Sequence, residues 1–156
     1  MAGGATSIFY TEGIRQMGLG AVDMNSETSL AMLLIKDAPN GNPDDPDLKT
    51  VTAVLTAASV SSECDFTNYS RKTVTGTTWA ADDTNNRVEE TFSTLTYGAA
   101  GGATNNNIGG ALLYQFTSDD DDSIPLAFWN LGTITTSGIT VTVASGSEGA
   151  IQGTYA

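Results

Sequence analysis

The chain has 156 residues, and its 18 acidic residues outweigh six basic ones to give a formal net charge of −12. Such a charge repels the phosphates of nucleic acids, so we expect no direct binding to DNA or RNA. Histidine is absent, which removes the commonest general base and transition-metal ligand, and the single cysteine, Cys64, excludes an intrachain disulfide framework.

The length indicates one domain, which we place over residues 1–156. The N-terminus has no basic region followed by an apolar run, so it does not resemble a secretory signal. No stretch reaches the roughly 18 consecutive apolar residues of a membrane-spanning helix, so no membrane partner is expected. The 17 glycines and the low share of charged residues, 15%, favour strands joined by tight turns.

The first part of the chain predicts an arm, a short helix and a buried strand. Residues 1–7 are small and polar, which indicates a flexible arm. The pattern becomes helical from Ser7, with Ser7 or Thr11 as the N-cap, and the helix is expected to end by Gly20. Its apolar stripe is formed by Ile8, Ile14, Met17 and Val22. The apolar run Ser29–Lys36 has the length of a strand that is buried on both faces.

A loop and an ambiguous segment follow. Residues 38–47 contain three prolines and an Asn-Gly pair, which predicts a surface loop. We expect either this loop, with Asn42 as an interface candidate, or the N-terminal arm to become ordered when a partner binds. Leu48–Ser62 fits both helical and strand periodicity, and we favour a short helix with Asp47 as its N-cap.

The remainder of the chain is typical of strands and turns. A flexible loop of low complexity is expected at residues 98–107, and three apolar runs fill Ile108–Val143. The last of these runs alternates isoleucine and valine with threonine, as half-buried strands do. The tail, residues 144–156, either pairs as a last strand or stays mobile. The other predicted strands are Tyr69–Thr75, Thr78–Ala81 and Arg87–Thr96.

Together these elements indicate a mainly β protein. The arrangement that suits them best is an antiparallel β-sandwich of about seven strands, with one or two short helices near the N-terminal half.

Three groups of carboxylates are candidates for holding a cation. Asp44, Asp45 and Asp47 are interrupted by proline, and a solvated turn is the favoured interpretation for them. The residues Asp119–Asp122 are consecutive, so their side chains point in different directions, and a solvated hairpin turn is the favoured interpretation. Asp82, Asp83 and Asn85 are weak candidates for Ca²⁺, since one turn can aim several oxygens inward, although a turn cap explains them better. No bound metal and no cofactor are therefore expected.

No residue is nominated for catalysis. Glu89 and Glu90 are adjacent and face opposite sides of a strand, so they do not form an acid–base pair. Cys64 lies between Glu63 and Asp65, whose charges raise the pKa of its thiol, so we expect a small buried residue or an inert surface thiol. The sequence therefore does not indicate an enzyme.

Three aromatic residues, Trp79, Phe128 and Trp129, are candidates for a surface that binds a sugar or a protein. Aromatic faces stack on sugar rings, but core packing is expected for at least two of the three. An exposed tryptophan in this chain is more typical of a protein–protein interface. Trp79 and Trp129 are therefore interface candidates, together with Asn42.

Three stretches carry a further signal when they are read in order. They are ECDFTNYSRKTVT (63–75), WAADDTNNRVEETF (79–92), and IGGALLYQF with SDDDDSIPLAFWN (108–130). The first contains the pattern E-x-x-F-x-N-Y-x-R-K. Together they resemble a family of small virion-associated structural proteins of tailed bacteriophages, over most of the chain except residues 38–47 and the part after Val143.

The resemblance implies a structural protein of the virus particle and not an enzyme. We expect a capsid decoration (cement) protein on the exterior of the head, made in the cytoplasm of the bacterial host. Its partner is then the major capsid protein, and symmetric sites favour a trimer or dimer. A small acidic domain suits this exposed position. The alternatives are a receptor-binding or adhesion module on a tail or head fibre and a Ca²⁺-stabilised structural module.

Overall fold

Antiparallel strands dominate the part of the chain that the computed structural model describes, residues 6–24, 29–37, 41–59, 62–82, 87–145 and 151–155. The predicted mainly β class is therefore confirmed. The helices are α1 (Thr11–Gly18) and α2 (Val51–Ala57). The strands are β1 (Thr6–Phe9), β2 (Leu30–Lys36), β3 (Lys72–Thr73), β4 (Thr78–Asp82), β5 (Arg87–Thr91), β6 (Leu95–Ala100), β7 (Asn107–Gln115), β8 (Ile124–Thr135), β9 (Ile139–Ser145) and β10 (Ile151–Tyr155).

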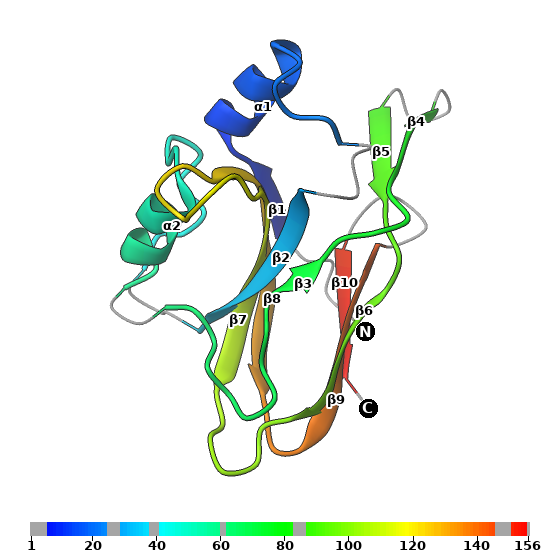
Figure 1. The fold of residues 1–156 in the computed structure, drawn as a ribbon. Helices are drawn as coiled ribbons and strands as arrows, with labels where there is room; N and C mark the ends of the chain where they lie inside the picture. Colours follow the sequence, from blue (N-terminus) through cyan, green and yellow to red (C-terminus); the bar gives the residue numbers. More distant parts are fainter. Residues whose placement is uncertain are drawn as a thin grey trace.

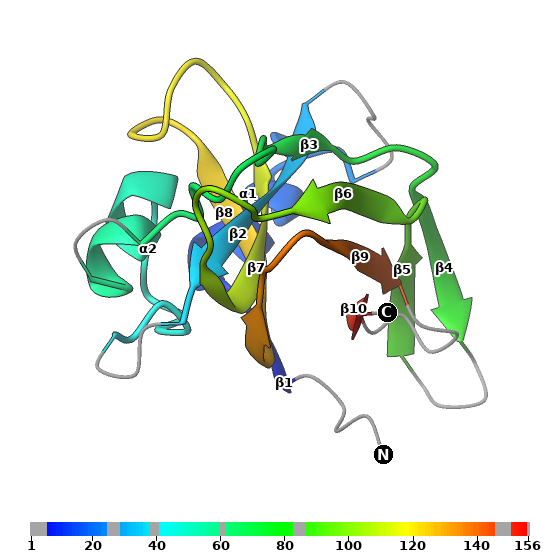
Figure 2. The same cartoon turned by 90° about the horizontal axis from the view of Figure 1, so that it is seen from below.

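The strands form three antiparallel sheets. The largest has the order β1–β8–β7–β2–β3, the second has the order β10–β9–β6, and β4 and β5 pair as a separate hairpin. The second sheet faces one side of the five-stranded sheet, and α2 lies on the other side (Figure 1). The view from below shows the same layers, with the β4–β5 hairpin beyond the second sheet (Figure 2).

The main core lies between the two larger sheets. Its buried side chains come from β2, β7 and β8 on one side and from β6 and β9 on the other. In β9, Val141 and Val143 are fully buried in this core, whereas Thr140 is exposed. The strand predicted from the alternating pattern is therefore confirmed.

A second core lies between the five-stranded sheet and α2. The strand β2 contributes to both cores, because Leu33 and Ile35 face α2 whereas Met32 and Leu34 face the second sheet. All four side chains are at most 1% exposed. Burial on both faces favours apolar residues at every position, which explains the continuous apolar run and confirms the predicted strand at Ser29–Lys36.

Hydrogen bonds to Thr50, Ser123 and Asp120 satisfy backbone amides in the first turn of α2. The Thr50 hydroxyl caps the helix by accepting a hydrogen bond from the Ala53 amide at 3.1 Å. The amides of the first two helical residues donate to the carbonyl oxygens of Ser123 and Asp120, each at 3.1 Å. The predicted short helix is confirmed, but Asp47 is not its N-cap, because the helix begins later in the chain.

The described N-terminal segment begins as a strand and not as a helix. The strand β1 pairs with β8, and Ile8 lies opposite Phe128. Helix α1 begins at Thr11, and the chain turns away after it through Gly20, whose φ is +71°. The predicted helical pattern from Ser7 is therefore wrong for the residues before Tyr10, which pair with the edge of β8, and the N-cap is Tyr10 and neither Ser7 nor Thr11. The predicted end by Gly20 is confirmed.

Two predicted strands differ from the observed ones. Tyr69–Thr75 contains only the two-residue strand β3, which pairs with β2. Arg87–Thr96 divides into β5 and the start of β6, because the chain crosses at residues 92–94 from the small hairpin to the second sheet. Periodicity does not reveal this change of sheet, since both parts alternate.

Residues 98–107 are ordered by hydrogen bonds, so the predicted flexible loop is wrong. Strand β6 continues to Ala100. Beyond it, the Thr67 amide donates to the Thr104 carbonyl at 3.0 Å, and the Thr104 amide donates to the Thr67 hydroxyl at 2.9 Å. These partners lie far away in the sequence, so composition alone indicates mobility where the fold supplies order.

The described part of the tail is a strand. Strand β10 pairs with β9 in an antiparallel register, with Tyr155 opposite Val141. Of the two alternatives for the tail, a last strand or a mobile segment, the strand is therefore correct for residues 151–155. The rest of the tail, residues 146–150 and 156, and most of the predicted N-terminal arm, residues 1–5, lie outside the described residues.

Gly110→Ala is expected to destabilise the fold. A Cβ at this position would lie 2.3 Å from Cζ of Phe128 and 3.0 Å from the Trp129 carbonyl oxygen, so the ring and the strand would have to move. Overpacking of this kind costs about 1–3 kcal/mol. Urea denaturation monitored by fluorescence would show a lower midpoint.

Gly98→Ala is the matched control, because nothing lies within 4 Å of a Cβ added there. We expect an unchanged or raised midpoint for this variant, since alanine restricts the unfolded chain. Equal losses of stability in the two variants would contradict the packing of Phe128 against Gly110.

Candidate functional site

The sequence candidates for cation binding lie at the end of β4. Asp82 is the last residue of that strand, and Asp83 and Asn85 lie outside the described residues. This Ca²⁺ site therefore stays a prediction. Trp79 lies in the same strand, with its backbone opposite Glu90 of β5. Its role at an interface also stays a prediction.

Trp129 is a core residue and not an interface residue. Its side chain is 5% exposed and packs in the main core, because β8 is an inner strand and this position faces the second sheet. Phe128, the next residue toward the N-terminus, lies in the second core at 4% exposure. The expectation that at least two of the three aromatic candidates pack in the core is confirmed.

The acidic turn Asp119–Asp122 connects β7 to β8 as predicted, but it is more than a solvated turn. A carboxylate oxygen of Asp119 accepts hydrogen bonds from the amides of Asp121 and Asp122 at 3.0 and 3.1 Å. Asp120 points toward the body of the protein, where its side chain is 30% exposed. There it pairs with a cation from a distant part of the chain.

Arg71 is that cation. Its guanidinium donates two hydrogen bonds to Asp120, at 2.5 and 2.7 Å, and two to Glu63, at 2.8 and 2.6 Å. It also lies 5.6 Å from the centre of the Tyr114 ring. These partners, Asp120 foremost, raise the pKa of Arg71 above its ordinary value. We call Arg71, Glu63 and Asp120 the Arg71 clamp, since two bidentate pairs fix the guanidinium plane.

Residues of the pattern E-x-x-F-x-N-Y-x-R-K hold the fold together. Glu63 and Arg71 belong to the clamp, and the Tyr69 hydroxyl donates to Glu63 at 2.9 Å. Phe66 packs edge-on against Tyr69, with 5.1 Å between the ring centres. The Lys72 ammonium lies 5.4 Å from the centre of the buried Tyr97 ring. Residues of this pattern therefore contribute to the scaffold of the fold.

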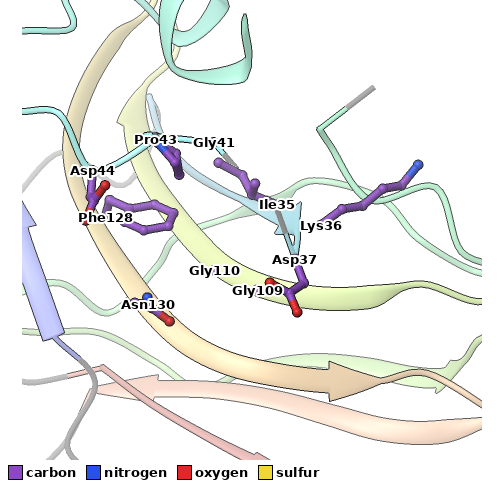
Figure 3. A pocket seen from close by; sticks show the side chains of 10 residues that line it. All are labelled: Ile35, Lys36, Asp37, Gly41, Pro43, Asp44, Gly109, Gly110, Phe128 and Asn130. Carbon is purple, nitrogen blue, oxygen red and sulfur yellow. The ribbon is translucent and has the colours of Figure 1, made fainter. Parts of the chain in front are cut away.

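A cavity of about 240 Å³ lies on the α2 side of the five-stranded sheet, beside the loop that precedes α2. Gly109 and Gly110 of β7 form its floor, so bare backbone lies beneath it (Figure 3). The same view shows Asp37 and Asp44 on opposite sides of this floor, with the Phe128 ring between the floor and the loop. Cavities of this kind are the commonest sites of ligand and partner binding.

The loop along this cavity is held in place by the rest of the chain. The Asn42 amide donates to the Ala57 carbonyl at 2.9 Å, and the Tyr10 hydroxyl donates to the Pro43 carbonyl. Residues 41–47 thus form the predicted surface loop, and these hydrogen bonds tie them to the rest of the protein. The first three residues of the predicted loop lie outside the described ones. The side chain of Asn42 is exposed, and its role at an interface stays a prediction.

The cavity carries negative charge. Asp37 and Asp44 are exposed. Lys36 is the one cation among the lining residues, and it forms an ion pair outside the cavity. Its ammonium lies 2.9 Å from a carboxylate oxygen of Asp65. The Tyr10 hydroxyl beneath the loop has its pKa raised, first by burial and then by the charge of Asp44. A negative potential therefore extends around the loop and into the cavity.

Sequence reasoning did not find this cavity, because its lining comes from four separate segments of the chain. One signal was available: two consecutive glycines in a predicted strand leave its surface without side chains. Consecutive glycines indicate either an unfilled space beside the strand or the close approach of another group. Only the fold shows that the Phe128 ring approaches Gly110 and that Gly110 also lines the cavity.

Cys64 is a buried, inert thiol, which confirms one of the two alternatives expected for it. Its side chain is 3% exposed. Burial raises its pKa to about 12, with smaller contributions from Lys36, which lowers the value, and from Glu63 and Asp65, which raise it. The neighbouring carboxylates act in the predicted direction, but burial dominates.

Within the described ranges, no helix is long and apolar enough to cross a membrane. In the same residues, no group of three or more acidic or cysteine side chains is placed to hold a metal ion. No protein-family model, no curated protein and no solved structure matches this chain.

Arg71→Met is expected to destabilise the protein, because it leaves Glu63 and Asp120 without their partner. The loss should be about 2–3 kcal/mol, between the values for exposed and buried ion pairs. Urea denaturation measures it. Arg15→Met is the matched control, since the Arg15–Glu12 pair lies on the surface of α1, and we expect no measurable change there. Equal behaviour of the two variants would show that the Arg71 clamp contributes nothing.

Cys64 is expected to react with a thiol reagent such as DTNB only when the protein unfolds. Its thiol ionises near pH 12 in the folded chain against 9.0 when exposed, so at pH 8 it is protonated and buried. Because the folded state disfavours the thiolate, the free energy of unfolding should also fall as the pH rises from 9.0 toward 12. Ser70→Cys in a Cys64→Ala background provides an exposed thiol that should react at once. Rapid reaction of native Cys64 would contradict its burial.

Proposed function

We propose that this protein is a structural component of a tailed-bacteriophage virion, a decoration protein that binds the exterior of the assembled capsid. The observation that carries the proposal is the resemblance of the three stretches between residues 63 and 130. The fold supports it, since the first stretch supplies Glu63 and Arg71 of the Arg71 clamp, the third supplies Asp120, and both contribute to the main core.

The physical character of the surface also suits this role. The chain carries a net charge of −12, which keeps a protein soluble and favours docking on a basic partner. Loops at both ends of the sandwich are tied by hydrogen bonds, as at Asn42 and Thr104. A rigid domain loses little conformational entropy when it binds, so more of the contact energy is available to reinforce a shell.

The partner in this proposal is the major capsid protein, and the role is mechanical and not catalytic. Capsid sites repeat around local symmetry axes, so a trimer or dimer of the chain would bind them with matching symmetry. Binding at the junction of neighbouring subunits would oppose the pressure of the packaged DNA.

The number of copies in purified particles tests the proposal. We expect dozens to hundreds of copies per particle by quantitative mass spectrometry, in a fixed ratio to the major capsid protein. A few copies per particle would overturn it in favour of an adhesion module on a tail or head fibre.

Binding to preformed shells provides a second readout of the same proposal. Purified protein added to particles that lack it should cosediment with them and raise the temperature at which they release DNA. Unassembled capsid subunits are the control and should not bind. The interaction should weaken as salt is raised from about 0.05 to 0.5 M, because the acidic surface contributes through screened charges. Failure to bind intact shells would contradict a decoration role.

A further inference from the structure

We propose that the cavity above Gly109 and Gly110 receives the side chain of a lysine or arginine from a partner protein. The inference deepens the proposed function, on which the identity of the partner rests. The chemistry of the cavity is independent of that identity and is argued from its size, its charge and its walls.

The size of the cavity suits one long side chain. Its volume of about 240 Å³ lies below the roughly 300–1,000 Å³ typical of sites for drug-sized ligands. Its floor is the backbone of Gly109 and Gly110, against which Asp37 and the Phe128 ring already lie, so the open space is narrow (Figure 3). The loop beside it is already fixed by the Asn42 and Tyr10 hydrogen bonds. The site is therefore preformed, and binding would not have to order it.

The charge of the cavity selects a cation. Asp37 and Asp44 lie on opposite sides of the floor, and the Lys36 ammonium is paired with Asp65 and points away from it (Figure 3). Neither Asp37 nor Asp44 has an ion-pair partner among the described residues. A guanidinium or ammonium group that enters the cavity would form charge-assisted hydrogen bonds to either carboxylate.

The hydrogen bonds already made leave room for such a group. One carboxylate oxygen of Asp37 accepts from the Thr133 hydroxyl at 2.5 Å, which orients the carboxylate and leaves its other oxygen to accept a further bond. The amide oxygen of Asn130 accepts from the Gly132 amide at 3.0 Å. Its amide nitrogen remains as a donor, suited to a backbone carbonyl of the incoming chain.

The walls of the cavity argue against a sugar. Phe128 is only 4% exposed, so it offers no open ring face on which a sugar could stack. Ile35 is also buried, whereas Pro43 is half-buried and can contact the aliphatic stem of lysine or arginine. The carboxylates of Asp37 and Asp44 are therefore the main groups that the cavity offers to a ligand.

A short arginine peptide, Ac-Gly-Arg-Gly-NH₂, tests the inference on the isolated full-length protein. In ¹⁵N–¹H correlation spectra we expect saturable shifts of the Gly109, Gly110 and Asn130 amides. The same peptide with citrulline, which has nearly the shape of arginine but no charge, should give none. Asp37→Asn and Asp44→Asn should each weaken binding by about fivefold, the effect of losing one solvent-exposed ion pair.

Asp121→Asn is the matched control, since it removes the same charge from the exposed β7–β8 turn. It should leave the affinity unchanged, whereas an effect equal to that of Asp44→Asn would show attraction to net charge only. Equal binding of the citrulline peptide, no saturable shift with the arginine peptide, or equivalent shifts with a monosaccharide such as glucose would each overturn the proposal.

The same variants separate this inference from the proposed function. If shells bind the wild-type protein and the Asp37→Asn/Asp44→Asn double variant equally, the cavity is not the contact and the inference fails, while decoration stands. If the arginine peptide binds the cavity but intact shells do not bind the protein, decoration fails and the cavity serves another basic partner.

Discussion

Burial of the five-stranded sheet on both faces is the constraint on which the rest of the structure depends. One face is covered by the second sheet, and the other by α2 and the loop before it. A helix of seven residues is unstable alone, so α2 needs outside support. That support comes from the carbonyl oxygens of Asp120 and Ser123, in the turn that the Arg71 clamp ties down. By holding this turn in place, Arg71 therefore stabilises α2 against the five-stranded sheet, although Arg71 is not part of the helix.

The cavity lies where this covering ends. The Phe128 ring packs in the second core and against Gly110, and Asp37 lies against Gly109, so the cavity opens beside these groups at the edge of that core. The covering loop contributes Asp44 to one side, and the end of β2 places Asp37 on the other (Figure 3). A binding site can thus arise at the edge of a core, because packed core residues hold its walls in place while the carboxylates stay exposed to solvent.

The places where prediction from the sequence failed share one physical cause. Ser7 and its neighbours favour a helix by periodicity, but pairing with β8 satisfies more of their backbone groups as a strand. Residues 98–107 have the composition of a mobile loop, but Thr67 and Asp65 supply them with hydrogen bonds. Asp120 belongs to a run of four acids, yet it alone among them meets Arg71. In each case the deciding partner lies at least 30 residues away.

The sequence by itself determined the β-rich class, the doubly buried strand at Ser29–Lys36, the three apolar strands after Ile108 and the inert character of Cys64. These follow from periodicity and composition, which act over a few neighbouring residues. Only the tertiary structure decided which strands share a sheet, that Trp129 lies in the core, and that Asp37, Asp44 and two glycines surround one cavity. The physical reason is that sheet pairing and cavity lining join residues distant in the chain, and no local pattern records where such residues meet.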